Sequence, residues 1–197
     1  MKLCGLTGGV GMGKSTAARW FREQGIGVVD TDELARQLTQ PGQTALNEIQ
    51  TAFGAAIVGA DGHLRRAALA EIVFADPAAR QKLESILHPK IRQLWLAQVD
   101  AWRQENRPLG IVVIPLLFET RAEASFAKII CVACTPAAQQ HRLQARGWMP
   151  EQINRRIAAQ MPVENKIVQS DFLVWTEGEM QNHFAQLDRI MAALRTA

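Results

Sequence analysis

The chain has 197 residues, of which 48% are hydrophobic and 21% are charged, and its formal net charge is +3. A chain of this length forms one domain, or one domain with an inserted subdomain. The mild charge, without a basic run longer than Arg65-Arg66 or Arg155-Arg156, argues against a nucleic-acid partner. No apolar segment is long enough for a signal peptide or a membrane span, so we expect no membrane contact.

Five short apolar runs, rich in β-branched residues, alternate with helical patterns. They cover residues 3–6, 26–29, 111–114, 129–133 and 172–175. This alternation predicts an α/β fold in which a five-stranded parallel sheet lies between two layers of helices. Thr135-Pro136 and Asp76-Pro77 each place a capping side chain before a proline, which predicts helix starts. Met149-Pro150 similarly predicts a helix that reaches Gln160.

A glycine-rich segment, residues 8–15, follows the first predicted strand and precedes the first predicted helix. Its sequence, GGVGMGKS, satisfies the phosphate-binding loop (P-loop) pattern of a glycine, four variable positions and Gly-Lys-Ser. Glycines let successive backbone N–H groups point inward around an anion, and the helix dipole adds positive potential. Lys14 would reach the β- and γ-phosphates, and the Ser15 hydroxyl would bind Mg²⁺. The residues expected to hold the nucleoside triphosphate are Gly9, Val10, Gly11, Met12, Gly13, Lys14, Ser15 and Thr16.

Two carboxylates follow the second predicted strand, at Asp30 and Asp32. Ligands of open parallel sheets lie beyond the carboxyl ends of the strands, so we expect both acids near the γ-phosphate. If the chain stays extended there, both side chains share one face and can act together, on the metal or on an acceptor hydroxyl. The structural alternative is that Asp32 only caps the next helix.

Nearly eighty residues separate the second predicted strand from the third, far more than one crossover helix requires. They contain helical patterns at 32–38, 44–53, 66–74, 76–87 and 89–105. Because proline restricts the residue before it, His88-Pro89 predicts a junction between the last two helices, and His88 is either a substrate contact or only part of that junction. We expect a helical, acceptor-binding insertion over residues 31–108 within a single domain, 1–197.

The region after the fourth strand has the composition of a mobile lid, over residues 139–162. Arg142 and Arg146 are four residues apart and share a helix face, and Arg155 and Arg156 follow a glycine-containing break. Guanidinium groups stabilise the charge of a transferred phosphoryl group, although solvated surface arginines are the alternative. We expect Arg142 to be functional, and Arg146 and Arg156 are the next candidates for a role in phosphoryl transfer.

Three cysteines, an odd number, favour a reducing compartment, and we expect a cytoplasmic protein that is a monomer or a weak homo-oligomer. Cys131 and Cys134 have CxxC spacing but belong to an apolar run typical of a buried strand, so structural cysteines are the better interpretation.

Two other classes of P-loop protein fit the sequence poorly. The guanine-binding motif of small GTPases is incomplete at Asn165-Lys166, and no strand ends in the Asp-Glu of motor or transporter ATPases. A small-molecule kinase therefore fits best. A shikimate-kinase-like enzyme and a regulatory P-loop ATPase remain the alternatives.

In combination, these segments resemble dephospho-coenzyme A kinase, a P-loop kinase family related in fold to nucleoside monophosphate kinases. The resemblance covers most of the chain and rests on segments in a specific order: residues 6–16, 30–36, 62–74, 87–89 and 115–119, then Arg142, Arg156, Gln160, Lys166 and Asp171. It implies ATP-dependent phosphorylation of the ribose 3′-hydroxyl of dephospho-CoA, the last step of CoA biosynthesis.

The resemblance also implies residue roles. Asp32 would be the base or orienting acid on the hydroxyl, with Lys14 and Arg142 acting on the phosphates. The residues along the acceptor pocket would be Asp32, Arg66, His88, Leu117 and Glu119, and Ser15 would hold the metal. One departure is Thr176, where the family usually has asparagine, and it bears on recognition of the base.

Overall fold

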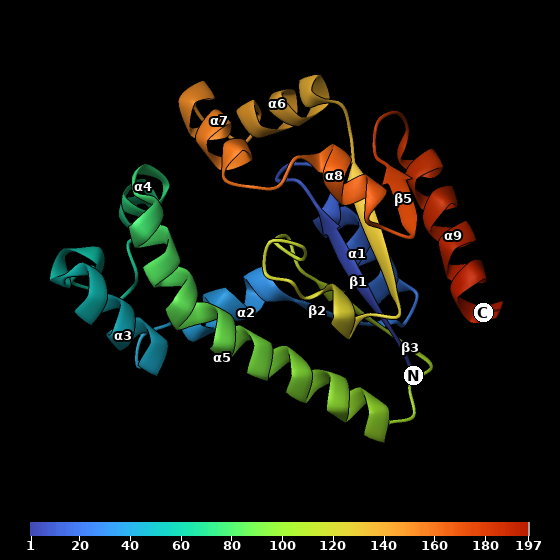
Figure 1. Ribbon diagram of the computed structural model, residues 1–197, viewed down its shortest axis with the longest axis horizontal. Helices are drawn as coiled ribbons and strands as arrows, with labels where there is room; N and C mark the ends of the chain where they lie inside the picture. Colours follow the sequence, from blue (N-terminus) through green and yellow to red (C-terminus); the bar gives the residue numbers. More distant parts are fainter. Residues whose placement is uncertain (197) are drawn as a thin grey trace. The chain divides into compact units, whose positions relative to one another are not determined.

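The computed structural model describes residues 1–196. Its central element is a five-stranded parallel sheet (Figure 1). The sheet order is β2-β3-β1-β4-β5, and every pair of neighbours is parallel. The strands are β1 (Lys2–Gly8), β2 (Gly27–Asp30), β3 (Leu109–Val113), β4 (Lys128–Ala133) and β5 (Phe172–Trp175). The five predicted strands are confirmed, with boundaries that differ by at most two residues.

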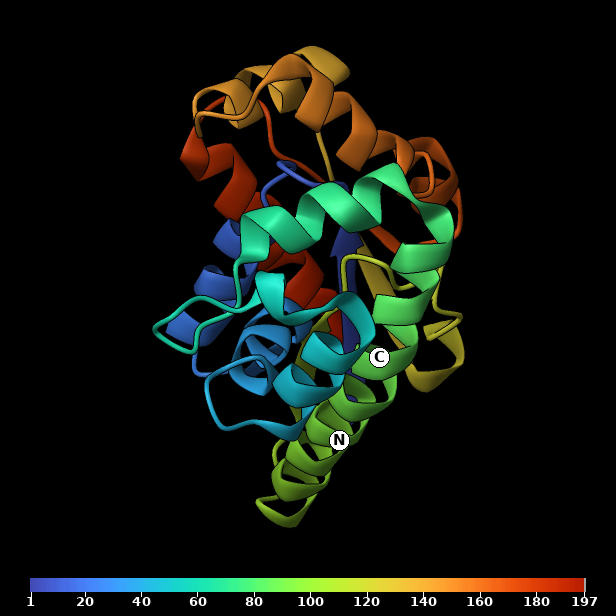
Figure 2. The ribbon, with the colours of Figure 1, turned by 90° about the vertical axis from the view of Figure 1, so that its left-hand side faces the viewer.

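Helices cover both faces of this sheet. On one face, α1 (Lys14–Glu23) and α9 (Met180–Thr196) pack together over the strands, as Figure 2 shows in blue and red. Their apolar side chains, including Phe21 and Leu187, form the main core with Ile111 and Ile130. On the other face, α8 (Val163–Val168) contacts β1 and β4. Because helices cover both faces, side chains on both sides of the strands are mostly apolar, which explains the continuous apolar runs in the sequence. The predicted three-layer α/β class is confirmed.

The chain divides into two compact units, a sheet unit (residues 1–30 and from Ala101 onward) and a helical unit (Thr31–Asp100). The helical unit contains α2 (Thr31–Leu38), α3 (Thr44–Phe53), the 3₁₀ turn η1 (Ala55–Ile57), α4 (Arg66–Ala75) and most of α5 (Pro77–Gln104). Its own core is built on Ile49, Ile57, Leu69 and Val73. The boundary with the sheet unit falls inside α5.

The predicted junction at His88-Pro89 is wrong, because α5 continues through Pro89 as a single helix of 28 residues. An internal proline removes one helical hydrogen bond and costs about 3 kcal/mol. Apolar burial on both sides opposes that cost. Before the proline, Leu83 and Leu87 pack on the core of the helical unit, and after it Trp95 and Val99 are buried.

The predicted helix caps are confirmed. The Thr135 hydroxyl accepts a hydrogen bond from the Ala138 N–H at 3.2 Å, and α6 (Pro136–Gln144) begins at the next residue. Asp76 Oδ1 accepts from the Ala78 N–H at 2.8 Å at the start of α5. Helix α7 (Pro150–Ala158) begins where predicted and ends two residues before Gln160.

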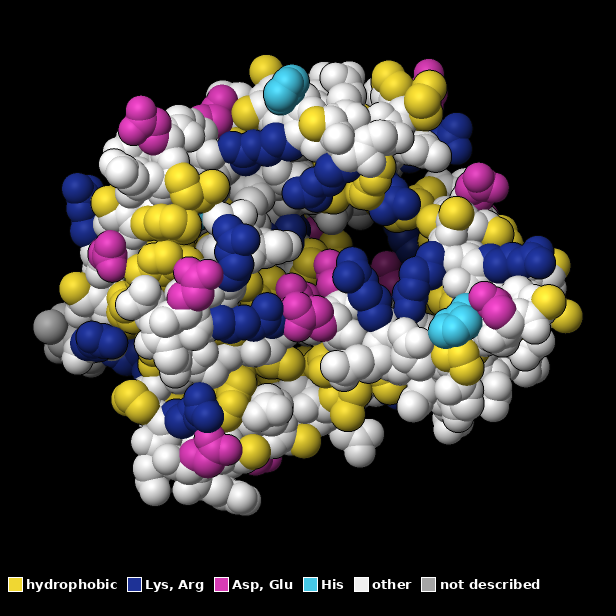
Figure 3. All heavy atoms as spheres, turned by 180° about the vertical axis from the view of Figure 1, so that it is seen from behind, with side chains coloured by type: hydrophobic (Ala, Val, Ile, Leu, Met, Phe, Trp, Pro, Cys, Tyr) yellow, Lys and Arg dark blue, Asp and Glu magenta, His cyan; other side chains and the backbone are white. Residues whose placement is uncertain are grey.

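Charged side chains of both signs are interspersed on the face drawn in Figure 3, where basic groups occur beside acidic ones. Among residues 1–196, no helix has the length and apolarity that crossing a bilayer requires. The three cysteines are buried free thiols, as expected for structural cysteines, and burial raises the pKa of Cys4 and of Cys131 to about 11.

Candidate active site

The P-loop connects β1 to α1, which is the context that its motif predicts. Gly13 directly precedes α1 and has φ of 100°, in the left-handed region that favours glycine. Its carbonyl oxygen accepts the first helical hydrogen bonds, from the N–H groups of Thr16 and Ala17. The loop therefore leads directly into the amino-terminal end of a helix, where unpaired N–H groups and the helix dipole favour an anion.

The Lys14 ammonium group folds back over the loop. Its Nζ donates hydrogen bonds to the carbonyl oxygens of Gly8 and Gly9, both at 2.9 Å. The neighbouring Ser15 is exposed on the first turn of α1. Lys14 and Ser15 are thus consecutive residues at the start of α1, where a polyphosphate and its metal ion would need a cation and a hydroxyl group.

The two predicted acids are not both on the strand. Strand β2 ends at Asp30, and α2 begins at Thr31, so the extended chain on which we expected the pair to act does not exist. Asp32 lies inside the first turn of α2 and not before it, so the predicted capping position is also wrong. A carboxylate in a first turn interacts favourably with the helix dipole, and Asp32 is exposed there.

Arg142, on α6, is bound to the segment after β5. Its Nη1 donates to the Thr176 hydroxyl at 2.8 Å, and its Nη2 donates to the Thr176 carbonyl oxygen. The same hydroxyl lies 3.0 Å from the carbonyl oxygen of Met12 and 3.2 Å from that of Ala133. Thr176 therefore joins Arg142 to the P-loop and to the end of β4.

Glu177 continues this connection. Its carboxylate accepts hydrogen bonds from the Thr135 hydroxyl at 2.7 Å and from the Thr135 N–H at 2.9 Å. These bonds, with the nearby Arg142 charge, hold the pKa of Glu177 below its ordinary value. The segment after β5 is thus attached to the start of α6 by two successive residues. Sequence reasoning missed this role of Glu177, because the partners are 42 residues apart.

Of the other predicted lid arginines, Arg156 has a defined partner. Its guanidinium carbon lies 4.1 Å from the centroid of the Trp148 ring, a cation–π contact, and burial lowers its pKa. A role of Arg146 and Arg156 in phosphoryl transfer stays a prediction.

Glu119 belongs to a buried charge pair. Its Oε1 lies 2.8 Å from Lys166 Nζ and accepts from the Met161 N–H at 2.8 Å, while Lys166 also donates to the Pro115 carbonyl oxygen at 2.7 Å. Lys166 has a side-chain exposure of 0%, and Glu119 Oε2 is buried without a hydrogen-bond partner among residues 1–196. Leu117, the other predicted acceptor contact in this segment, is fully buried.

The helical unit contains two more predicted residues. Arg66, at the start of α4, donates from Nη2 to the Thr39 hydroxyl at 2.6 Å. Burial, and then the nearby Arg36 charge, lower the pKa of Arg66. His88 is half-buried on α5. Arg66 is therefore held in place by a neutral partner, which leaves its positive charge for a ligand.

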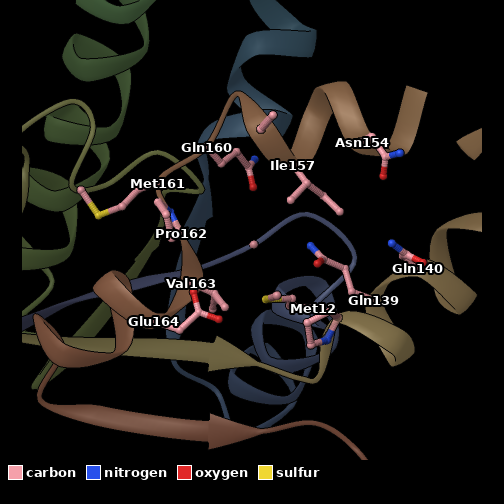
Figure 4. Close-up of a pocket in the computed structure, with 13 residues that line it drawn as sticks. Met12, Gln139, Gln140, Asn154, Ile157, Gln160, Met161, Pro162, Val163 and Glu164 are labelled. Carbon is pink, nitrogen blue, oxygen red and sulfur yellow. The ribbon is translucent and has the colours of Figure 1, made fainter. Parts of the chain in front are cut away.

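A pocket of about 470 Å³ opens beside the P-loop within the sheet unit (Figure 4). Its walls come from the loop, α6, α7 and the start of α8, and they are mostly apolar, with Met12, Ile157 and Val163. Gln139 and Gln160 supply amide groups on opposite sides of the loop. This mixture of apolar walls and a few polar groups is typical of small-molecule sites.

The parallel sheet and the loop between its first strand and first helix define the α/β fold of P-loop nucleotide-binding proteins. The family model for dephospho-CoA kinase matches residues 2–182. The chain therefore belongs to the dephospho-CoA kinase family.

Individual relatives agree with this assignment. A dephospho-CoA kinase of Bdellovibrio bacteriovorus is 40% identical over 191 residues, which cover 97% of this chain and 95% of that protein. The crystal structure of TT1252 from Thermus thermophilus superimposes with a TM-score of 0.82 and is 33% identical, covering 98% of this chain and 97% of that one. A shikimate kinase of Bacteroides thetaiotaomicron has a TM-score of 0.52 at 16% identity, with 98% of each chain covered, and shares the fold alone.

Proposed function

We propose that this chain transfers the γ-phosphoryl group of ATP to the ribose 3′-hydroxyl of dephospho-CoA, giving CoA and ADP. The observation that carries the proposal is a complete P-loop between β1 and α1 in a chain whose residues 2–182 match the dephospho-CoA kinase family. Shikimate as the acceptor is not favoured, because the shikimate kinase resembles this chain in fold alone.

The P-loop residues, Gly9 to Thr16, would hold the ATP phosphates. The Lys14 ammonium would exchange its bonds to the Gly8 and Gly9 carbonyl oxygens for bonds to phosphate oxygens. Ser15 fits a Mg²⁺ ion, since its exposed hydroxyl is a hard oxygen ligand and Mg²⁺ otherwise prefers phosphates and water. When bound, Mg²⁺ supplies positive charge that neutralises the phosphates.

Asp32 would orient the 3′-hydroxyl group and accept its proton. The hydroxyl oxygen forms a bond to the γ-phosphorus as the bond from that phosphorus to the β–γ bridging oxygen breaks, and the electron pair leaves with ADP. The proton passes to the Asp32 carboxylate and then to water. Arg142 would stabilise the phosphate charge from the lid region, residues 139–162, with the N–H groups that its bonds to Thr176 leave available.

The acceptor would bind mainly through the helical insertion, residues 31–108, with Arg66 as the cationic contact for its phosphates and His88 as a polar contact. In the sheet unit, we propose Leu117 and Glu119 as further acceptor-binding residues, and Lys166 holds the Glu119 carboxylate in place. A closed lid would exclude water and suppress ATP hydrolysis. We further propose a cytoplasmic enzyme, monomeric or weakly self-associating, without a nucleic-acid partner.

The test incubates the protein and Mg-ATP with dephospho-CoA, with shikimate, or with water alone, and measures ADP and the mass of the product. We expect ADP in equal amount to CoA with the first acceptor and little ADP otherwise. Phosphorylated shikimate would identify a different kinase. ADP released at the same rate without any acceptor would identify a regulatory ATPase.

A further inference from the structure

Val10, in the P-loop, has both of its backbone polar groups bonded to glutamine side chains from outside the loop. Its N–H donates to Gln160 Oε1 at 3.0 Å, and its carbonyl oxygen accepts from Gln139 Nε2 at 2.7 Å. Gln139 lies on α6, and Gln160 follows the end of α7. Figure 4 shows the two side chains on opposite sides of the loop. Each amide orientation is set by its partner, because an N–H needs an acceptor and a carbonyl oxygen needs a donor.

The approach of Gln139 depends on the absence of a side chain at Gly9. A Cβ atom at Gly9 would lie 3.2 Å from Gln139 Nε2 and 2.8 Å from Met12 Sδ. Gln139 itself is only 4% exposed. A buried amide that lost its partner would carry the full cost of its desolvation, so this contact is part of the folded structure and not an incidental surface contact.

We propose that Gln139 and Gln160, which we call the Val10 clamp, are positioning residues that order the P-loop before the nucleotide binds. This proposal deepens the proposed function and rests on it. Because the Val10 N–H already has a protein acceptor, it serves as a fixed point of the loop and not as a phosphate donor in this conformation. This revises the role that the motif predicted for Val10.

The clamp acts on nucleotide affinity and not on the chemical step. A loop that is already ordered loses less conformational freedom when a diphosphate or triphosphate binds. The binding free energy is therefore more favourable by the entropic cost that ordering the loop would otherwise add. A net hydrogen bond changes an equilibrium constant by about 2- to 10-fold. The loss is the same in the ground state and the transition state, which raises KM and leaves kcat nearly unchanged.

The test replaces each glutamine by methionine, which is similar in length but neither donates nor accepts strongly. We expect Gln139→Met and Gln160→Met to weaken Mg-ADP binding, measured by titration calorimetry, by about 3- to 10-fold each. The KM for ATP should rise by the same factor, while kcat and the KM for dephospho-CoA stay within about twofold. The matched control is Gln144→Met, an exposed glutamine on the same helix that does not line the pocket.

Hydrogen exchange of the Val10 amide, followed by NMR of the full chain without nucleotide, tests the clamp independently of activity. We expect slow exchange in the unaltered protein and in Gln160→Glu, which keeps an acceptor oxygen, and fast exchange in Gln160→Met. Val10 exchange as fast as that of an unstructured peptide in the unaltered protein would overturn the proposal, even if the variants did not fold.

Two binding results would also overturn it. The first is that both methionine variants bind Mg-ADP as tightly as the unaltered protein does. The second is that the control, Gln144→Met, weakens Mg-ADP binding by as much as they do. The proposed function fails separately, if the unaltered protein binds Mg-ADP but does not phosphorylate dephospho-CoA.

Discussion

Each unit contains a lysine–glutamate ion pair. The two pairs have nearly equal N–O distances but differ in burial. In the sheet unit, Lys166 and Glu119 are 2.8 Å apart with side-chain exposures of 0% and 22%. In the helical unit, Lys90 and Glu48 are 2.9 Å apart with exposures of 32% and 41%. Distance therefore does not distinguish them. Burial does, because a charge without its partner is far more costly away from water than at the surface.

The same contrast separates the proposed roles of the two units. The sheet unit builds its site from buried connections, such as the bonds of Thr176 to Arg142 and to the P-loop. The helical unit presents exposed side chains at its proposed site, Asp32 and Arg66. Substitutions that remove these buried bonds should thus change stability, while substitutions of the exposed residues should change catalysis or acceptor affinity alone.

The largest expected effect tests the pairs directly. Lys166→Met should lower the free energy of unfolding by about 3–5 kcal/mol, because it leaves the Glu119 carboxylate buried with one oxygen already unpartnered. Lys90→Met should lower it by no more than about 1 kcal/mol, as is typical of a surface pair. Chemical denaturation of both variants measures the difference. Equal losses would show that burial does not set the strength of these pairs.

A double variant sharpens this result. Adding Glu119→Gln to Lys166→Met removes the uncompensated charge, so much of the lost stability should return. A double variant as unstable as Lys166→Met would instead assign the loss to packing around the lysine stem.

The second expected effect concerns the exposed acid of the helical unit. Asp32→Asn should lower kcat by roughly 10²-fold, the contribution of a positioned acid or base, and leave ATP affinity and stability nearly unchanged. Steady-state kinetics with dephospho-CoA and calorimetry with ATP measure these quantities. Glu33→Gln, the neighbouring exposed acid on α2, is the matched control and should retain full turnover. If Asp32→Asn also kept full turnover, the role of Asp32 would be structural and not catalytic.

These differences explain how much could be predicted from the sequence. The strands, the α/β class and the P-loop were predictable, because apolar periodicity and glycine spacing are local and act through the backbone. The continuation of α5 through Pro89 was not, since packing of distant side chains outweighs a local preference.

Predictions for the site follow the same rule. The loop motif identified Lys14, but no spacing rule joins Glu119 to Lys166 or Val10 to Gln160. Helix α2 begins at Thr31, one residue before its predicted start. This small shift places Asp32 on the helix and not on the extended chain that would have let it share a face with Asp30. Contacts between side chains far apart in sequence depend on the folded core, and a single sequence does not specify them.

The third expected effect tests the cationic contact that we propose for the acceptor. Arg66→Lys keeps the positive charge but loses the planar guanidinium group, which holds the Thr39 hydroxyl and would bind a phosphate at the same time. The KM for dephospho-CoA should rise by about tenfold, with the KM for ATP unchanged. Arg65→Lys, at the exposed neighbouring position, should change neither value. A rise in both KM values for Arg66→Lys would show that the helical unit is not specific to the acceptor.

The smallest expected effect concerns an exposed ion pair of the sheet unit, between Asp171 and Lys128. Burial alone would raise the pKa of Asp171, but hydrogen bonds from Lys128 Nζ at 2.6 Å and the Ile129 N–H at 2.8 Å, with the Lys128 charge, hold it below its ordinary value of 3.8. A carboxyl group whose pKa is lowered by folding stabilises the protein above its unfolded pKa. That stabilisation is lost as the pH falls through the lower pKa of the folded state.

Asp171→Asn should therefore lower the free energy of unfolding by about 1 kcal/mol at pH 7, since both partners are partly exposed. The gap between the two proteins should close as the pH falls below about 4, where the carboxyl group of the unaltered protein becomes protonated. Chemical denaturation at several pH values measures this gap. A gap that stayed constant at acid pH would mean that the charge of this exposed pair contributes nothing, and that the loss comes from the second acceptor oxygen, which asparagine lacks.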